Sequence, residues 1–350
     1  MFRGGEIRVD APATGQAPQE PGTTKRLRAD PIPINWHPGL SIYASEAFLR
    51  SDGDRFGWIG GTDEEARLRC ILPYTIIRKP GLQLVRFRTQ TLPWGAELDL
   101  AEEKSFLHSV VEYFRSTGAD MVIPSGNTAI FRTYPDGAAA APYGTFLKDL
   151  TQPEEALMSE IRKTYRQNIR KAAAAGVQIK CGPEYLDVSY ELISTTLKRS
   201  GSSFKSYNEF KHRVLALGEY VKIFVAEHDG AIQGCMVAPF SDHTAYNCYA
   251  GSRPEPILGA MHLLHWEAMR QFRALGVKQF DFQGVRINPD KGSKQDGIMH
   301  YKQGFGGRLV QGYLWKYSFR PLGSAAYSVA VRLLMGGDIV DQERRKLVRE

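Results

Sequence analysis

The first half of the chain alternates between short apolar runs and turn sequences. A brief helical pattern at residues 45–50 precedes three strand-like runs. These runs lie at residues 55–60, 66–78 and 82–89. Stretches rich in glycine, proline and acidic residues separate them, as expected for hairpin turns. Residues 101–118 then carry apolar side chains at helical spacing and end at Gly118, which suits a helix C-terminus. A buried strand is expected at residues 120–124.

The second half repeats this order. Three strands are expected at residues 222–228, 231–240 and 243–250. Asp229-Gly230, a strong turn dipeptide, separates the first two of them. A helix at residues 258–275 and a strand around Phe280 complete the block. The segments FRSTGADMVI (114–123) and FRALGVKQFD (272–281) share Phe, Arg and Gly at the same offsets, which indicates an internal duplication.

The repeated order predicts an α/β (α+β) fold with two tandem domains, each with a mixed, mainly antiparallel sheet and flanking helices. The expected boundaries are a disordered segment at 1–32, a first domain at 33–150, a second, catalytic domain at 151–320, a helix at 321–335 that packs back on the first domain, and a charged tail at 336–350. The N-terminal segment is rich in Pro, Gly and Ala and poor in large apolar residues, so we expect it to be disordered.

Composition excludes some classes of protein. The sequence has no run of 18 apolar residues and no apolar signal-peptide core, so we expect neither a membrane span nor secretion and place the protein in the cytoplasm. Its four cysteines lack CxxC spacing, which indicates reduced thiols. The net charge of +7 favours contact with anions such as phosphates, nucleic acid or a membrane surface, and a solvated basic surface explains it equally well. Peripheral membrane contact therefore stays open.

One predicted helix concentrates positive charge. We expect it to run from an N-cap at Thr151 to Gly176. Its apolar stripe consists of Leu157, Ile161, Tyr165 and Ile169, and its parallel basic stripe of Arg162, Lys163, Arg166, Arg170 and Lys171. No acidic residue follows these cations within four positions, so their repulsion stays uncompensated unless an anion binds. We favour an anion-contacting helix over a merely solvated face.

Residues 279–319 are the strongest candidate for a functional site. They are predicted to form a buried strand, a polar loop with Lys291, Lys294 and Asp296, and a glycine-rich turn that holds Tyr301, Lys302 and Gly304 to Gly307. Glycines allow a backbone to approach a ligand closely, and rings beside cations suit stacking on bases and clamping of phosphates. No similar lysine-glycine turn follows the strand at 120–124, so we expect the chemistry in the second half.

Common catalytic and metal-binding motifs are missing from the sequence. It contains no P-loop, GxGxxG, GxSxG or HExxH pattern. His262 and His265 lie three positions apart on a predicted helix, but no third ligand has a fitting spacing, so we expect no metal site. We also expect no redox cofactor.

Four segments resemble the Fem (FemABX-like) family of aminoacyltransferases, within the GNAT superfamily of acyltransferases. They are IRKTYRQNIRKAAAAGV, YNCYAGSRPE, LLHWEAMRQFRALGVKQFDFQGV and GIMHYKQGFGGRLV. The resemblance covers residues 153–321 and implies twin GNAT-like domains with a groove between them. It also implies transfer of an aminoacyl group from aminoacyl-tRNA to an amine of a peptidoglycan-precursor peptide.

The resemblance further implies site residues. The family's aromatic-lysine dipeptide falls on Tyr301-Lys302, and its Asp-Phe-x-Gly strand on Asp281, Phe282 and Gly284. The expected catalytic residues are Lys302, Tyr301 and Asp281. The expected substrate-binding residues are Tyr249, Arg199, Lys205, Tyr207, Phe282 and Gly306. The residues expected to bind tRNA or other phosphates are Arg162, Lys163, Arg166 and Arg170.

The turn before the helix at 258–275 bears on the donor. Coenzyme A acyltransferases of the superfamily cradle pyrophosphate on a [QR]xxGx[GA] turn, but here Arg253 precedes a stretch with two prolines, which lack backbone donors, and Gly259 comes late. The leading hypothesis is therefore an aminoacyl-tRNA-dependent aminoacyltransferase. Two alternatives stay open: an N-acyltransferase that uses acyl-coenzyme A or a carrier thioester, and a non-catalytic protein that binds RNA or another polyanion. The transferred amino acid, the acceptor amine and the oligomeric state are also open.

Overall fold

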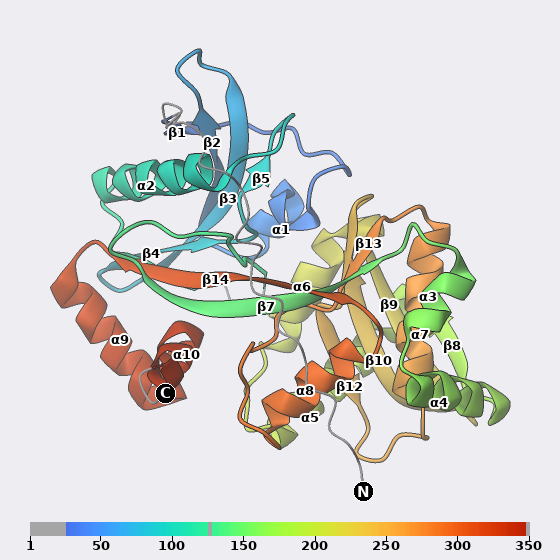
Figure 1. The fold of residues 1–350 in the computed structure, drawn as a ribbon. Helices are drawn as coiled ribbons and strands as arrows, with labels where there is room; N and C mark the ends of the chain where they lie inside the picture. The colour runs from blue at the N-terminus through green and yellow to red at the C-terminus, as the bar shows by residue number, and fades with distance from the viewer. Residues whose placement is uncertain (1–25, 125–127, 348–350) are drawn as a thin grey trace, which may run out of the picture.

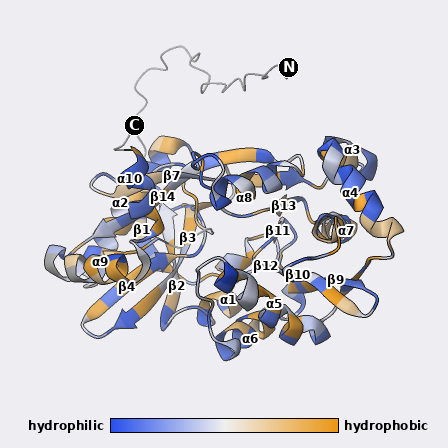
Figure 2. Ribbon diagram, turned by 90° about the horizontal axis from the view of Figure 1, so that it is seen from below, coloured by the Kyte–Doolittle hydropathy of each residue, from blue (hydrophilic) through white to orange (hydrophobic). Residues whose placement is uncertain are grey.

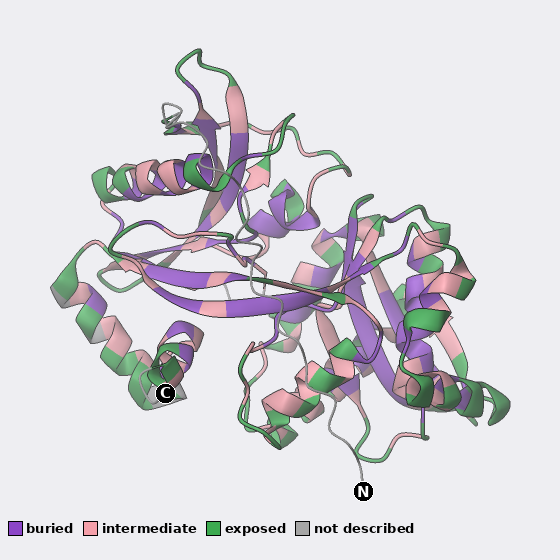
Figure 3. Ribbon diagram, viewed as in Figure 1, coloured by how far each residue is buried: buried purple, intermediate pink, exposed green. Residues whose placement is uncertain are grey.

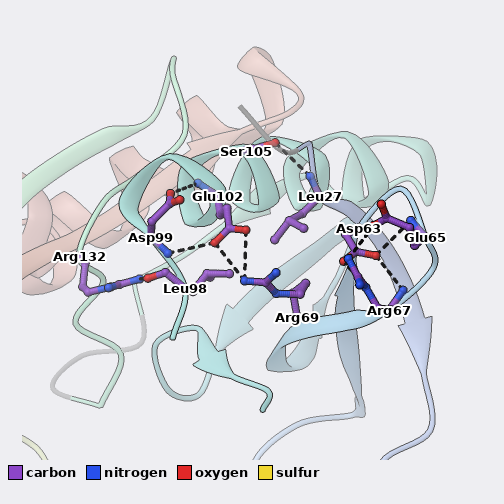
Figure 4. Close-up of polar contacts among 10 residues, drawn as sticks. All are labelled: Leu27, Asp63, Glu65, Arg67, Arg69, Leu98, Asp99, Glu102, Ser105 and Arg132. Carbon is purple, nitrogen blue, oxygen red and sulfur yellow. Dashed lines mark hydrogen bonds and ion pairs between the residues drawn. The ribbon is translucent and has the colours of Figure 1, made fainter. Parts of the chain in front are cut away.

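The computed structural model describes residues 26–124 and 128–347. Most of the N-terminal segment predicted to be disordered lies outside the described residues. Within them, that prediction is wrong for β1 (Arg28–Ile32), which pairs antiparallel with β2 (Arg55–Thr62). An edge strand is held by main-chain hydrogen bonds, which do not require large apolar side chains. The side chain of Leu27 is also buried, and its amide donates to Ser105 Oγ (Figure 4).

A ten-stranded sheet crosses the molecule (Figure 1). Its order is β1-β2-β3-β4-β6-β14-β7-β13-β11, with β5 paired to β3. The strands not yet introduced are β3 (Leu68–Lys79), β4 (Leu82–Phe87), β5 (Leu92–Pro93), β6 (Met121–Val122), β7 (Ala139–Asp149), β11 (Thr244–Tyr246), β13 (Gln279–Asp281) and β14 (Arg308–Ser318). A second sheet, of order β12-β10-β9-β8, consists of β8 (Gln178–Cys181), β9 (Val221–His228), β10 (Ala231–Pro239) and β12 (Tyr249–Ser252).

The long strands β7 and β14 join the two halves. They pair antiparallel from Arg308 opposite Leu147 to Lys316 opposite Ala139. The end of β14 also pairs with β6 of the first half, and the end of β7 pairs with β13 of the second half. β7 is not predicted from the sequence, because this alanine-rich run with Pro142 has no alternating pattern. The last strand of the chain therefore completes the sheet of the first half.

Helices cover both halves. They are α1 (Glu46–Arg50), α2 (Leu100–Ser116), α3 (Glu154–Glu160), α4 (Lys163–Ala174), α5 (Leu186–Arg199), α6 (Tyr207–Ala216), α7 (Ala260–Ala274), α8 (Lys294–Gln303), α9 (Pro321–Met335) and α10 (Ile339–Leu347). The predicted helix at 101–118 is confirmed as α2, which begins with a capping box between Asp99 and Glu102. Glu102 also forms an ion pair with Arg69 of β3 (Figure 4), so the capping residue holds the helix on the sheet.

The repeated order of elements is confirmed. α2 lies between β4 and β6 in the chain, and α7 lies between β11 and β13. In both cases the two strands beside the helix pair in parallel. Buried residues follow the strands and the inner helix faces of both halves (Figure 3). Phe106 and Phe114 belong to the first core, and Phe272 and Phe280 to the second.

Two predictions in the middle of the chain are wrong in detail. The single helix at 151–176 is divided into α3 and α4, because Ile161 and Arg162 have extended ψ angles of 136°. Thr151 does not cap it, since Pro153 holds the N-cap position. The apolar stripe still packs in the core, with Leu157, Ile161 and Ile169 buried. The strand at 243–250 is likewise divided into β11 and β12, which belong to different sheets.

Two predictions near the C-terminus also need correction. The polar loop and glycine-rich turn expected at 291–307 largely form α8, with Tyr301 and Lys302 near its C-terminal end. The charged tail at 336–350 includes a helix, α10, whose Val340 is buried against Ala141 and Leu314. Within the described residues, every helix is too short or too polar to cross a membrane.

Candidate active site

Lys302 reaches from α8 to the backbone that follows β13. Its Nζ donates to the carbonyl oxygens of Gln283 at 2.5 Å and Gly284 at 2.9 Å. Burial lowers the pKa of Lys302 to about 8, and the negative charge of Asp281 opposes this shift. An ammonium group has three donors, so one N–H of Lys302 remains without an acceptor among the described residues.

Asp281 and Gln283 lie next to this ammonium group. The carboxylate of Asp281 accepts hydrogen bonds from the Thr145 hydroxyl and, at 2.6 Å, from the Gln283 amide. Burial raises the pKa of Asp281, and the Thr145, Gln283 and Lys302 interactions oppose the shift. Gln283 has a φ of 56°, which is strained for a residue with a side chain. Its side chain donates to the Tyr43 hydroxyl of the first half, so both halves hold this conformation.

Tyr301 and Phe282 belong to an aromatic wall beside Lys302. The ring of Phe282 lies 5.2 Å from that of Phe305, and the Tyr301 hydroxyl lies 3.3 Å from His265 Nδ1. Burial raises the pKa of Tyr301 far above its ordinary value and lowers that of His265 to about 4. Both side chains are therefore uncharged near neutral pH. Across the part of the chain that the structure describes, no group of three or more His, Cys, Asp or Glu side chains could hold a metal ion.

The glycines after Lys302 have a packing function. A Cβ on Gly304 would lie 2.2 Å from the ring of Tyr165, and one on Gly306 would lie 2.5 Å from the Glu160 carbonyl oxygen. The amides of Gly304, Phe305 and Gly306 donate to carbonyls at the end of α8. Their N–H groups are therefore not free to bind a ligand, contrary to the expectation from the sequence. These two glycines therefore let the end of α8 pack closely against α3 and α4.

A cationic cluster of Arg86, Arg88, Lys205 and Arg213 lies between the two halves. Arg88 is only 4% exposed, yet its Nε and Nη1 have no hydrogen-bond partner among the described residues. Asp52 forms ion pairs with Arg88 and Arg213. Burial lowers the pKa of Arg86 and of Arg88 to about 10, and that of Lys205 to about 8. Buried guanidinium groups with spare donors are suited to a phosphate or carboxylate.

Residues 247–249, where the chain passes from β11 to β12, link this cluster with the surroundings of Lys302. Lys205 Nζ donates to the Tyr249 hydroxyl at 2.7 Å, so these two predicted substrate-binding residues lie together. Burial raises the pKa of the neighbouring Cys248, and Lys205 and Arg213 oppose the shift. Asn247 donates its backbone N–H to the Asp281 carbonyl at 2.9 Å, and its buried Oδ1 has no partner within the described residues.

Sequence reasoning missed several of these residues. Tyr43, Arg88, Arg213 and Asn247 were not predicted, because their meeting depends on how the halves pack. One signal was available: Arg86 and Arg88 stand at alternate positions at the end of an apolar strand, where charge is costly to bury.

Other predicted binding residues lie elsewhere or have a structural contact. Arg199 donates to the Ser252 carbonyl at 2.6 Å and Tyr207 to Asp187 at 2.5 Å, so they fasten α5 to β12 and to α6. Arg166 donates to the carbonyls of Ser159 and Ile161 and closes the end of α3.

The remaining cations of the basic stripe are exposed. These are Arg162, Lys163, Arg170 and Lys171. Arg166 and Arg170 also line a cavity of about 660 Å³ together with Glu154, Glu155 and Arg270. Glu154 pairs with Arg270 at 2.7 Å, so part of the acidic charge in this cavity is already neutralised.

Gly259, the N-cap residue of α7, packs against another helix. Gly259, with a φ of 89°, lies directly against α4, and a Cβ there would be 2.1 Å from the Asn168 carbonyl oxygen. In the loop before it, the amides of Arg253 and Ile257 donate to Gln233, and two positions are prolines. A helix N-terminus binds phosphate through free amides; here the two prolines have none, and the Ala260 amide donates to the Ile257 carbonyl at 2.9 Å.

Comparison with known proteins gives the class of fold. Residues 159–303 match the family model described as Acetyltransferase (GNAT) domain. Among solved structures, FemX is similar with 13% identity and a TM-score of 0.62, over 81% of this chain and 94% of that chain. The C-terminal domain of a putative lysylphosphatidylglycerol synthetase from Agrobacterium fabrum is similar with 16% identity and a TM-score of 0.50, over 83% of this chain and 95% of that chain. No curated protein sequence matches the chain.

The predicted fold class is confirmed: a mixed α/β fold with GNAT-like units in tandem and flanking helices. The match to the GNAT domain model lies in the second half of the chain, and it supports an acyltransferase as the class of enzyme.

Proposed function

We propose that the protein is an aminoacyltransferase that moves an aminoacyl group from aminoacyl-tRNA to an amine of a peptidoglycan-precursor or related peptide. The packing of Gly259 at the N-terminus of α7 is the observation that carries the choice of donor. A coenzyme A donor needs free amides at this point for its pyrophosphate, whereas Gly259 is packed against Asn168. A charged tRNA does not need this site. Aminoacyl-tRNA is a cytoplasmic donor, so the reaction would take place there.

The groups around Lys302 fit such a transfer. The acceptor amine, uncharged, attacks the ester carbonyl of the aminoacyl-tRNA. A C–N bond forms, the ester C–O bond breaks, and the tRNA oxygen leaves with a proton. The free N–H of Lys302 would stabilise the oxyanion, and with a pKa near 8 the side chain could give its proton to the leaving oxygen and take up the proton that the attacking nitrogen loses. The unpartnered Oδ1 of Asn247 would accept an N–H of the amine.

The cationic cluster supports an anionic acceptor. Arg88 and Arg213 approach Tyr249 from the two halves, as expected for a group that binds between them. A precursor that carries phosphate or carboxylate groups would use the spare donors of Arg88. The exposed cations of α4 would contact the tRNA backbone.

Replacing Lys302 with methionine tests this function. The variant keeps an unbranched side chain, one atom shorter, but removes its donors, and one such donor is worth about 10²–10³ in rate. We expect transfer of a labelled amino acid from mixed charged tRNA to peptidoglycan precursors to slow by about that factor. Transfer is followed by mass spectrometry, with acetyl-coenzyme A offered in a parallel reaction.

Lys294→Met is the matched control, because Lys294 is exposed at the start of the same helix. Its rate should equal that of the native protein. Transfer from acetyl-coenzyme A but not from charged tRNA would refute the donor, and native activity in Lys302→Met would refute the site. Binding of RNA without any transfer would favour a non-catalytic protein.

A further inference from the structure

Helix α9 exposes an apolar stripe that the proposed reaction does not use. Its sequence, PLGSAAYSVAVRLLM, is mostly apolar or small, yet Val329 is 56% exposed and Leu333 is 81% exposed. Ala325 lies one turn before Val329 and is exposed as well, so successive turns present one face. Figure 3 shows α9 at the rim of the molecule, with exposed and intermediate residues along it, and Figure 2 shows its apolar colouring.

The opposite face of α9 attaches it to the first half. Ser324 is buried and donates to the Asp120 carbonyl at 3.3 Å, and Tyr327 packs with Leu82 and Met121. The stripe of Ala325, Val329 and Leu333 is therefore not the face that anchors the helix. Exposed contiguous apolar side chains of this kind mark interaction surfaces.

Positive charge flanks the stripe. A cavity of about 590 Å³ between α9 and α10 is lined by Val329 and by charged residues, namely Lys316, Arg332, Asp341, Arg344 and Arg345. The acids nearby are already paired: Asp338 and Asp341 bind Lys316. The guanidinium group of Arg332 has neither a hydrogen bond nor an ion pair in the described part of the chain, so the charge that faces outward is positive.

We propose that α9 and α10 dock the protein on the surface of an anionic phospholipid bilayer. Val329 and Leu333 would enter the boundary between headgroups and acyl chains, as in other interfacial helices. The arginine-lined cavity would receive headgroup phosphates. A second copy of this chain fits the surface less well, because a symmetric contact would bring the same arginines of both copies together.

The docking surface is linked to the loop that leads to Lys302. Arg286 pairs with Glu343 of α10 at 2.9 Å and donates to Gln342 at 2.6 Å. Lys346 of α10 pairs with Asp290 of the same loop at 3.3 Å. A docked protein would thus hold its candidate active site close to the membrane surface. The inference itself stands on α9 and α10 and does not depend on the proposed reaction.

Vesicle flotation with the full chain tests the inference. The probes are vesicles of phosphatidylcholine alone and vesicles that also contain phosphatidylglycerol. We expect binding to the second kind, and Leu333→Glu and Arg332→Glu should each lower the partition coefficient about tenfold. Leu215→Glu, at an exposed leucine of α6, and Lys79→Glu, at an exposed cation of β3, are the matched controls and should bind as the native protein does.

Three results would overturn the inference. Equal binding to both kinds of vesicle would remove the role of anionic lipid. A loss in Lys79→Glu as large as that in Arg332→Glu would show unspecific attraction to the net charge. A native dimer that Leu333→Glu converts to a monomer, with vesicle binding unchanged, would assign the stripe to a second copy. Circular dichroism of each variant verifies that it is folded.

Discussion

Lys302 is held so that its charge is sensitive to small changes around it. Two backbone carbonyls accept its hydrogen bonds, and burial lowers its pKa to about 8. Gln283, which supplies one of the carbonyls, keeps a left-handed conformation because Asp281 and Tyr43 bind it. A residue from the first half therefore helps to place a reactive group of the second half.

The pKa of Lys302 predicts a descending limb in the pH profile. Below about pH 8 the side chain is an ammonium that can stabilise an oxyanion, and above it the charge is lost. We expect the single-turnover rate at saturating acceptor to fall as the pH rises through about 8. The limb should be missing in Lys302→Met, whose residual rate can only follow deprotonation of the acceptor amine. A limb that persists in this variant would assign it to another group.

At the residue scale, the sequence indicates only a motif that sequence neighbours define. Tyr301 and Lys302 stand out as a dipeptide, but the sequence could not show that Arg88 and Arg213 meet at Asp52 or that Asn247 bonds to Asp281. A single arginine in a sequence has the same appearance on a surface as in a buried cluster. Its burial depends on tertiary packing between segments that lie far apart in the chain.

At the scale of elements, the C-terminal end of α8 packs against α3 and α4. The backbone turns at Ile161 and Arg162, and the Arg162 amide donates to the Gly304 carbonyl at 2.8 Å. The glycines at 304 and 306 let the two segments touch. The sequence predicted helical character here correctly but not the break, because the apolar spacing continues through Ile161 without interruption.

The exposed cations of α4 should contribute to binding of tRNA. Changing Arg162, Lys163 and Arg170 together to glutamine removes up to three phosphate contacts and leaves Arg166 in place to close α3. We expect weaker binding and a slope of log K against log [salt] that is flatter by about 0.7–0.9 for each lost contact. Titration at two salt concentrations measures both quantities.

A matched triple variant controls for the loss of net charge. Arg55, Arg78 and Lys79 are exposed cations of the first half, and their change to glutamine removes the same charge elsewhere. Equal weakening in both variants would contradict a specific role for α4.

At the scale of the whole molecule, the two halves share one sheet. β14 lies between β6 and β7, so the C-terminal part of the chain supplies a central strand. The sequence predicted the duplicated order of elements, since local patterns define it. The sequence did not show that β14 pairs with β6 of the first half. The partners of a strand are determined by the packing of the complete chain and not by the alternation of apolar and polar residues within that strand.

Removal of residues 308–350 should therefore destabilise both halves. The truncated chain loses the antiparallel partner of β7 and the link to β6. We expect no cooperative thermal transition by circular dichroism, whereas the full chain should unfold in one. Supplying residues 308–350 as a separate peptide should partly restore the transition. A truncated protein that melts at the temperature of the full chain would contradict a shared sheet.

The position of β14 also has a consequence for synthesis on the ribosome. While residues 150–307 are translated, the edges of β6 and β7 that later bind β14 have no partner from their own chain. Unpaired strand edges are templates for association with other chains. The nascent chain is thus expected to need protection by a chaperone until its last strand emerges, and slow elongation over this interval should lower the yield of native protein.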